Sequence, residues 1–179
     1  MERTVSWNIL IERGNLGFSA AHFITLNGLC EPLHGHNYGV RVEVAGALTD
    51  DALLLDFIAF KDIVRALCKD WDHRFLMPLH NPHLAVHGGE DEWEIRVDAR
   101  TRYVMPRATV VPLPVDNVTT ERLAEQLARR LAHTLAERGM DRQLERLTVG
   151  IEETEMQTAF YALPLSHHPS HHPSDGPPT

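Results

Sequence analysis

The sequence predicts a single α+β domain, in which an antiparallel β-sheet carries two amphipathic helices on one face. Three observations favour this class. Alternating segments rich in β-branched residues stand near both ends of the chain, two segments repeat apolar residues at helical spacing, and no parallel strand–helix–strand run appears. Two helices can cover only one face of the sheet, so the other face must be solvated or buried by another subunit.

The first three strands are expected before residue 50. The segment "TVSWNILIE" (residues 4–12) alternates, and "GFSAAHF" (17–23) looks like its antiparallel partner, with "RGNLG" as the turn between them. The segment "HNYGVRVEVAGAL" (36–48) alternates through Val40, Val42 and Val44, which predicts the third strand.

Two helices are expected, one in each half of the chain. Asp56 is suited to cap the first helix, Thr119 or Thr120 the second, and Gly139 is a natural stop. The apolar positions at helical spacing are Phe57, Phe60, Ile63, Val64 and Leu67 in the first helix, and Leu123, Leu127, Leu131 and Leu135 in the second.

The remaining strands flank the second helix. The segment "EWEIRVDARTRYVMP" (92–106) reads as a hairpin with polar residues at its turn. After the second helix, "RLTVGIEE" (146–153) and "MQTAFYALPL" (156–165) close the chain as two strands.

Composition limits the classes of protein to which the chain can belong. Its 179 residues and 43% hydrophobic content suffice for one domain, predicted over residues 1–165. The net charge of −8 does not favour nucleic acids or anionic membranes, and no apolar run approaches the length of a transmembrane helix. The segment "SHHPSHHPSDGPPT" cannot build a core, which predicts a disordered tail over residues 166–179.

The two cysteines imply no disulfide framework and favour a reducing cytoplasm. Cys68 lies on the apolar face of the first helix and is expected to be a small buried hydrophobic residue. Cys30 lies in the loop "NGLCEPLHGH", where chemistry is favoured over packing.

His22, His34 and His36 form a candidate zinc site. His34 and His36 are two residues apart at the entry to a strand, so their side chains point to the same face. His22 ends the segment "FSAAH", and the three imidazoles can meet if the two strands are neighbours. Three nitrogen ligands with an open fourth position are the composition of a catalytic zinc site. The alternative for the H-x-H pair alone is a hydrogen-bonded surface pair.

Cys30 can either complete a four-ligand zinc site or act as a separate nucleophile or base. A thiol is mostly protonated at neutral pH, so as a base it needs a partner. Asp72 and His73 in "WDHRF" offer one, because an aspartate can orient a histidine that exchanges a proton with the thiol. From these residues alone, an ordinary Asp–His pair at a helix end is the preferred interpretation.

Glu152 and Glu153 stand in a predicted strand, where neighbouring side chains face opposite ways. Only one of them can therefore point into a site, and its carboxylate is suited to accept paired N–H donors from a heterocycle. The other belongs to a solvated sheet face.

Together these motifs resemble the 6-pyruvoyl-tetrahydropterin synthase / 6-carboxy-tetrahydropterin synthase family. Six segments match in the family's order and spacing from about Phe18 to Tyr161. They are "FSAAH", "CEPLHGHNYGVRVEVAG", "LLDFIAFKDIV", "WDHRFL", "NVTTERLAEQLA" and "IEETEMQTAFY". No single segment is decisive, but the six in order make a specific match.

The resemblance implies a tunnelling fold, a four-stranded antiparallel sheet backed by two helices. Subunits of this family join edge to edge into trimeric barrels, and two trimers stack into a hexamer, which would cover the sheet edges. The segment from His80 to Asp116 is longer than in compact members of the family. It is expected to contain an inserted β-hairpin at about residues 88–106.

The resemblance also implies roles for individual residues. His22, His34 and His36 would bind zinc. Cys30, Asp72 and His73 would form a catalytic proton-transfer set assembled across a subunit interface, and Glu153 would bind the pterin ring, with Thr119 or Thr120 nearby.

The implied function is that of a zinc-dependent lyase acting on 7,8-dihydroneopterin triphosphate. The expected product is 6-carboxy-5,6,7,8-tetrahydropterin, a precursor of 7-deazaguanine compounds such as queuosine. One alternative is 6-pyruvoyl-tetrahydropterin formation. Another is dual activity with side-chain cleavage to 6-hydroxymethyl-7,8-dihydropterin for folate, because Glu31 directly follows Cys30 and a family branch with both residues is associated with both activities.

Two further alternatives remain open at this point. Glu31 can be a solvated loop residue without a role in catalysis. The whole chain can be a non-catalytic zinc-binding protein, in which Cys30 closes a four-ligand structural site.

Overall fold

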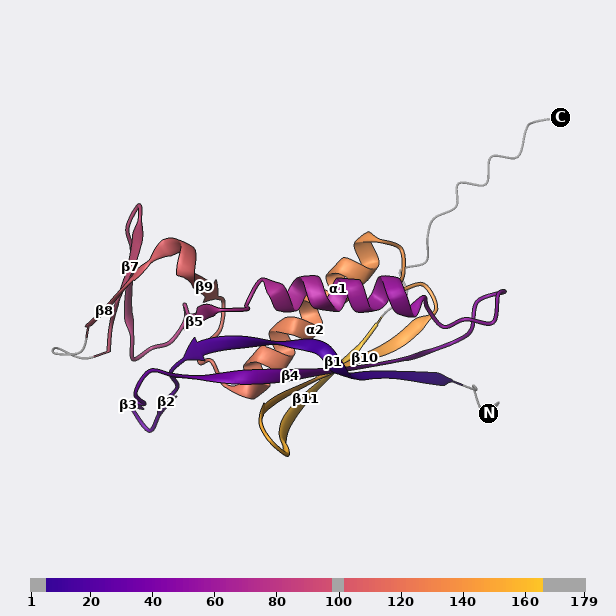
Figure 1. Ribbon diagram of the computed structural model, residues 1–179, viewed down its shortest axis with the longest axis horizontal. Helices are drawn as coiled ribbons and strands as arrows, with labels where there is room; N and C mark the ends of the chain where they lie inside the picture. Colours follow the sequence, from indigo (N-terminus) through magenta and orange to yellow (C-terminus); the bar gives the residue numbers. More distant parts are fainter. Residues whose placement is uncertain (1–5, 98–101, 166–179) are drawn as a thin grey trace.

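The computed structural model describes residues 6–97 and 102–165, and it confirms the α+β class (Figure 1). The main sheet has six strands in the order β11-β10-β4-β1-β5-β9. These strands are β1 (Trp7–His22), β4 (His34–Gly46), β5 (Arg74–Pro78), β9 (Val110–Leu113), β10 (Leu144–Thr154) and β11 (Gln157–Pro164). The predicted disordered tail from Ser166 lies outside the described residues.

The first two predicted strands are a single strand, β1, and the prediction of a turn at residues 13–17 was wrong. Both halves of β1 pair antiparallel with β4, with a register shift between Glu12 and Gly17. A glycine within a strand often marks such a bulge, because a backbone approaches it closely. A Cβ atom at Gly17 would lie 2.4 Å from the carbonyl oxygen of Tyr38. Since the chain keeps its direction, β1 ends with His22 opposite His34.

We expect Gly17→Ala to destabilise the protein by roughly 1–3 kcal/mol, because the added methyl group forces the β1 and β4 backbones apart. Gly39→Ala is the matched control. Gly39 is the register partner of Gly17, but its added Cβ would meet Glu152 at an ordinary 3.5 Å. Urea unfolding of both variants measures the difference. Equal stability of the two variants would contradict the close approach at Gly17.

The predicted four-stranded antiparallel sheet is present as β11-β10-β4-β1, and β5 and β9 extend it with parallel pairing. This extension was not predicted from the sequence. β5 and β9 are only five and four residues long, and the connection between them is a small sheet rather than a helix. The strand–helix–strand pattern that normally reveals parallel pairing is therefore missing.

Both helices pack on the same face of the sheet (Figure 1). α1 (Phe57–Lys69) is capped by Asp56, whose carboxylate accepts from the backbone N–H groups of Ile58 and Ala59. α2 (Thr120–Glu137) is capped by Thr119, and Gly139 follows its end with a positive φ of 64°. Their buried residues are Phe60, Ile63, Val64 and Cys68 in α1, and Leu123, Ala124, Leu127, Ala128, Leu131 and Leu135 in α2.

The predicted insertion is a separate three-stranded sheet of β6 (Ala85–Gly88), β7 (Glu92–Arg96) and β8 (Arg102–Pro106). The expected hairpin is its β7–β8 part, followed by the short 3-10 helix η1 (Arg107–Thr109). A second hydrophobic cluster joins this inserted sheet to the ends of β1, β5 and β9. It consists of Phe23, Phe75, Met77, Ile95 and Val110. A small hairpin, β2 (Thr25–Leu26) with β3 (Leu29–Cys30), lies at the same end of the molecule (Figure 1).

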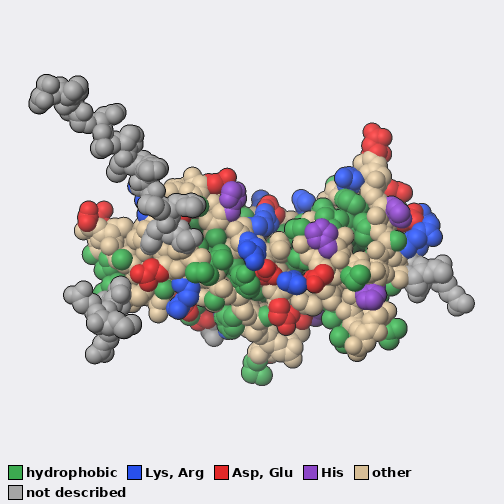
Figure 2. Space-filling view, turned by 180° about the vertical axis from the view of Figure 1, so that it is seen from behind, with side chains coloured by type: hydrophobic (Ala, Val, Ile, Leu, Met, Phe, Trp, Pro, Cys, Tyr) green, Lys and Arg blue, Asp and Glu red, His purple; other side chains and the backbone are tan. Residues whose placement is uncertain are grey.

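The surface carries charges of both signs. Figure 2 shows acidic and basic side chains interspersed over one whole face of the molecule. Several charged side chains of the protein form ion pairs, among them Arg122 with Asp116 and Arg129 with Glu125. Within residues 6–97 and 102–165, no helix is both long and apolar enough to cross a membrane.

Candidate active site

Three histidines meet where β1 ends and β4 begins. His22 is the register partner of His34, and His36 follows two residues later on the same face of β4. One ring nitrogen from each of the three lies within 4.8 Å of the other two. The structure therefore brings together the residues that the sequence suggested as zinc ligands.

Backbone carbonyl groups fix the orientation of two of these rings. His22 Nδ1 lies 2.9 Å from the carbonyl oxygen of Val118, and His34 Nδ1 lies 2.8 Å from that of Pro32. A carbonyl oxygen can only accept, so each Nδ1 donates, and in the neutral form of each ring the lone pair is then on Nε2. Burial lowers the pKa of His22, which is 1% exposed, and so favours the neutral ring that a metal requires.

The donor set fits a zinc ion with an open coordination position. Neutral imidazoles suit zinc, and three of them leave a fourth position for a substrate or water. Among the residues that the structure describes, the group of mutually close donor atoms consists of these three histidines, and Cys30 is not part of it. This composition differs from that of a closed structural site, which uses four protein ligands.

Glu153 on β10 faces the histidine cluster. Its Oε1 atom lies 3.5 Å from His22 Nε2 and 3.8 Å from His36 Nε2. Glu152 points to the other side of the sheet, where its carboxylate pairs with Arg41 at 2.6 Å. The structure thus separates the two glutamates as strand alternation requires, with Glu153 facing inward.

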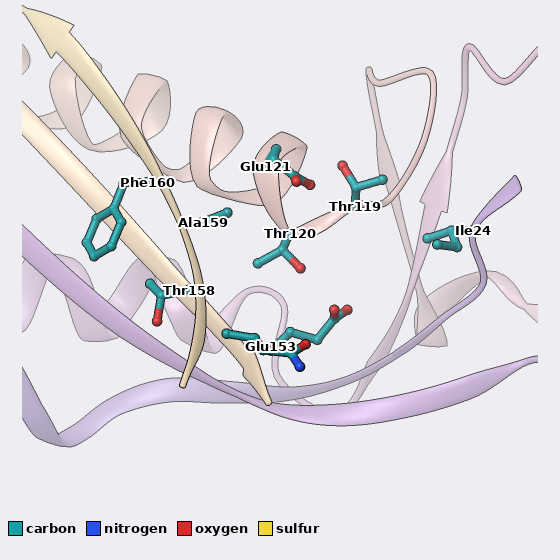
Figure 3. Close-up of a pocket in the computed structure, with 9 residues that line it drawn as sticks. Ile24, Thr119, Thr120, Glu121, Glu153, Thr158, Ala159 and Phe160 are labelled. Atoms are coloured by element: carbon teal, nitrogen blue, oxygen red, sulfur yellow. The ribbon is translucent and has the colours of Figure 1, made fainter. Parts of the chain in front are cut away.

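Glu153 also lines a pocket of about 580 Å³ beside the cluster (Figure 3). Thr119 and Thr120 line it from the N-terminus of α2, and Thr158 and Phe160 line it from β11. The pocket has the size of a small-molecule site and offers hydroxyl groups and carboxylates along its walls. All three residues that the sequence analysis placed in substrate binding therefore surround one cavity.

Asp72 and His73 form a hydrogen-bonded pair, with Asp72 Oδ2 3.0 Å from His73 Nδ1. The backbone N–H of Ser19 donates to Asp72 at 2.7 Å and, together with His73, lowers the pKa of that carboxyl group. His73 adopts a positive φ of 57°, which is uncommon for a residue with a side chain. Its ring is 81% exposed, at a second pocket of about 520 Å³ that His36 also lines.

Cys30 and Glu31 lie at the base of the β2–β3 hairpin, and both are half-buried. Cys30 packs against the second hydrophobic cluster, and its Sγ atom lies 3.5 Å from the carbonyl oxygen of Glu31. The backbone N–H of Glu31 donates to the carbonyl oxygen of Ile24 at 2.9 Å, which closes the hairpin.

The sequence analysis missed Tyr38 and Glu121. The Tyr38 hydroxyl lies 3.2 Å from His22 Nε2 and donates to Glu153 at 3.3 Å, and burial, followed by the nearby Glu153 charge, raises its pKa. Tyr38 continues the i, i+2 series of His34 and His36, a signal that was present in the sequence. Glu121 lines the pocket from the first turn of α2, and no sequence signal separates it from other exposed helix glutamates.

Comparison with known proteins identifies similar chains. A family model described as 6-pyruvoyl tetrahydropterin synthase matches residues 13–163. A Methanocaldococcus jannaschii protein, provisionally named 6-carboxy-5,6,7,8-tetrahydropterin synthase, is 30% identical over 110 residues, which are 61% of this chain and 67% of that protein. The Bacillus subtilis 6-carboxy-5,6,7,8-tetrahydropterin synthase is 38% identical over 65 residues, which are 35% of this chain and only 42% of the relative.

Solved structures extend the similarity over most of the chain. The 6-pyruvoyltetrahydropterin synthase of Plasmodium vivax has a TM-score of 0.84 at 27% identity, covering 89% of this chain and 99% of that chain. The structure is of a mutant in which a glutamate, described as a catalytic residue, is replaced by alanine. The Plasmodium falciparum 6-pyruvoyl tetrahydropterin synthase has a TM-score of 0.83 at 27% identity, and the match covers 89% of this chain and 98% of that chain.

Proposed function

Because the chain belongs to the 6-pyruvoyl tetrahydropterin synthase family and has its tunnelling fold, we propose that it is a zinc-dependent lyase acting on 7,8-dihydroneopterin triphosphate. The proposed product is 6-carboxy-5,6,7,8-tetrahydropterin, the product for which curated relatives such as the Bacillus subtilis enzyme are named. The observation that carries this proposal is the juxtaposition of three histidine nitrogens with Glu153, whose side chain also lines the pocket.

The proposed roles follow from the chemistry of each group. Glu153 accepts two hydrogen bonds from the 2-amino and N3–H edge of the pterin ring, and Thr119 and Thr120 lie beside it in the same pocket. A zinc ion bound by the three histidines would act as a Lewis acid toward the hydroxyl groups of the substrate side chain. Cys30 would then take a proton from that side chain and return it.

Asp72 and His73 would support Cys30 as a proton relay. Asp72 holds His73 at 3.0 Å and would stabilise its charged form when the ring receives a proton. The high exposure of His73 is consistent with a relay completed at a subunit interface, where a neighbouring subunit would cover the ring. We therefore propose a homo-oligomer, a trimer or a hexamer, in which sheet edges are paired between subunits.

A second activity, cleavage of the side chain to 6-hydroxymethyl-7,8-dihydropterin, is supported by Glu31. A carboxylate needs no relay to act as a base, and Glu31 follows Cys30 on the same hairpin. The Plasmodium vivax relative uses a glutamate described as catalytic. We propose that Cys30 and Glu31 are alternative acid–base groups beside one metal site. Formation of 6-pyruvoyl-tetrahydropterin is the remaining enzymatic alternative.

A purely structural zinc protein is less consistent with the site. That function would need Cys30 as the fourth ligand, and Cys30 is absent from the close group of donor atoms among the described residues. It would also leave the pocket and the Asp72–His73 pair without a use. For the enzyme we propose a place in 7-deazaguanine synthesis in the cytoplasm, a reducing compartment in which disulfides are rare.

Product analysis tests the proposed function directly. The zinc-loaded protein is incubated with 7,8-dihydroneopterin triphosphate, and the pterin products are identified by mass spectrometry. We expect 6-carboxy-5,6,7,8-tetrahydropterin, with 6-hydroxymethyl-7,8-dihydropterin as the second product. A metal-loaded, folded protein that leaves the substrate unchanged would refute the enzymatic proposal.

Glu153→Gln is expected to raise the Michaelis constant for the substrate about 10- to 150-fold, because a charge-assisted hydrogen bond contributes roughly 1.5–3 kcal/mol. Glu152→Gln is the matched control, since this neighbour pairs with Arg41 on the other side of the sheet. Steady-state kinetics of the two variants measure the effect. The opposite ranking of their Michaelis constants would show that the wrong glutamate has been assigned to the pterin.

A further inference from the structure

Cys30 and Glu31 stand at the base of a hairpin that is too small to be stable alone. β2 and β3 have two residues each, with Thr25 opposite Cys30. Asn27 and Gly28 form the turn with φ of 53° and 78°, the positive values that a two-residue hairpin turn requires. Isolated two-stranded hairpins are marginally stable in water, so contacts with the rest of the protein must fix its position.

Two asparagines hold the hairpin at Thr25. Asn117 accepts from the Thr25 backbone N–H at 3.1 Å and donates to the Thr25 carbonyl oxygen at 2.9 Å. Asn81 Nδ2 donates to the Thr25 hydroxyl at 2.8 Å. Thr25 is the pairing partner of Cys30, so these bonds determine where Cys30 lies.

Asn81 is a buried polar residue with both ends of its amide occupied. It is 5% exposed, and in the described part of the chain the buried polar side chains are His22 and Asn81. Its Oδ1 atom accepts from the His83 backbone N–H at 2.9 Å, while its Nδ2 atom reaches Thr25. A buried amide is costly unless it is hydrogen-bonded, so the geometry at Asn81 is tightly determined.

The hairpin and the inserted sheet pack against the same hydrophobic cluster. Cys30 packs on the second hydrophobic cluster, against which Trp93 and Tyr103 of the inserted sheet also pack. The Tyr103 ring stacks on Phe23 with a centroid separation of 5.6 Å, and Phe23 directly follows the metal-site residue His22. The inserted segment therefore contacts the chain directly before the hairpin, and it shares a hydrophobic cluster with Cys30 of the hairpin.

We infer that Asn81 is a positioning residue, which through the Thr25 hydroxyl fixes the hairpin that carries Cys30 and Glu31. The inference deepens the proposed function and rests on it, since these two side chains are its proposed acid–base groups. Asn81 and the inserted sheet then act on the chemical step, while the pterin is held separately by Glu153 and the metal by the histidines. Loosening the hairpin should slow turnover without weakening substrate or metal binding.

Thr25→Val tests the inference, because valine keeps the shape of threonine but cannot accept the hydrogen bond from Asn81. Thr25→Ser restores a hydroxyl and should rescue the loss. Thr148→Val, on β10 in the main sheet, is the matched control, because it makes the same threonine-to-valine substitution away from the hairpin. All three variants use the full chain with metal bound.

The first measurement is the rate at which iodoacetamide alkylates Cys30, followed by peptide mass spectrometry. We expect Thr25→Val to raise this rate about tenfold, and Thr25→Ser and Thr148→Val to stay near the wild-type rate. Cys68 reports on global unfolding in the same sample, because it is 2% exposed and burial raises the pKa of its thiol to about 12. Its alkylation should stay slow in every variant.

The second measurement is steady-state turnover. For Thr25→Val we expect kcat to fall about tenfold, with KM within about twofold and zinc content unchanged. An unchanged alkylation rate of Cys30 would overturn the inference, and so would faster alkylation with an unchanged kcat. If the wild-type protein does not turn over the pterin, the proposed function fails, and the alkylation rates still decide whether Asn81 holds the hairpin.

Discussion

Replacing His34 by alanine is expected to remove stoichiometric zinc binding and to lower activity about 100-fold or more. Groups that merely orient a metal ligand contribute roughly 10–100-fold to metal affinity, and the loss of a ligand should cost at least as much. His34 is one of three mutually close nitrogen donors, and its Nδ1 is already engaged by the Pro32 carbonyl, which leaves Nε2 for the metal. Two histidines cannot replace the lost contact.

The measurement is zinc per chain after dialysis against a weak chelator, with circular dichroism as the test of folding. His87→Ala is the matched control, since His87 is exposed on β6 of the inserted sheet. Histidines of the tail can also take up metal. They are His167, His168, His171 and His172, and they contribute the same background to both variants. A folded His34→Ala protein that retains stoichiometric zinc would disprove the assignment.

Cys30→Ala is expected to abolish formation of 6-carboxy-5,6,7,8-tetrahydropterin and to leave some 6-hydroxymethyl-7,8-dihydropterin. The carboxy-pterin reaction needs a proton taken from the carbon side chain and returned, which suits a thiolate supported by Asp72 and His73. Loss of a general acid–base group typically costs about 10²–10⁴-fold. The side-chain cleavage needs only a base near a substrate hydroxyl, and the Glu31 carboxylate remains to provide it.

Glu31→Ala is expected to have the reverse effect, because the thiol relay stays intact while the second base is lost. Mass spectrometry of the products from 7,8-dihydroneopterin triphosphate compares the wild type and both variants, and each should keep its zinc. Glu90→Ala, at an exposed position between β6 and β7, controls for the loss of a surface carboxylate. If Glu31→Ala leaves the whole product profile unchanged, Glu31 is a solvated loop residue and the dual activity is excluded.

The sequence by itself determined the features that depend on short-range patterns. The helix caps at Asp56 and Thr119 were predictable because a capping side chain bonds to backbone groups only a few residues away. The opposite orientations of Glu152 and Glu153 followed from strand alternation. The candidate ligand set of His22, His34 and His36 could be proposed because two of its members share one strand face and the third ends another predicted strand, and the resemblance implied the same three residues.

Only the tertiary structure decided features that join distant parts of the chain. The "RGNLG" segment looked like a turn, but both halves of β1 pair with one long strand, so the glycine produces a bulge instead of a reversal. The parallel strands β5 and β9 are too short to be recognised without a helix between them. Likewise, the bond from Asn81 to Thr25 spans 56 residues, and no local pattern specifies it. Long-range hydrogen bonds and packing depend on which distant segments of the chain come together, and for this protein they fix both the sheet order and the position of the β2–β3 hairpin.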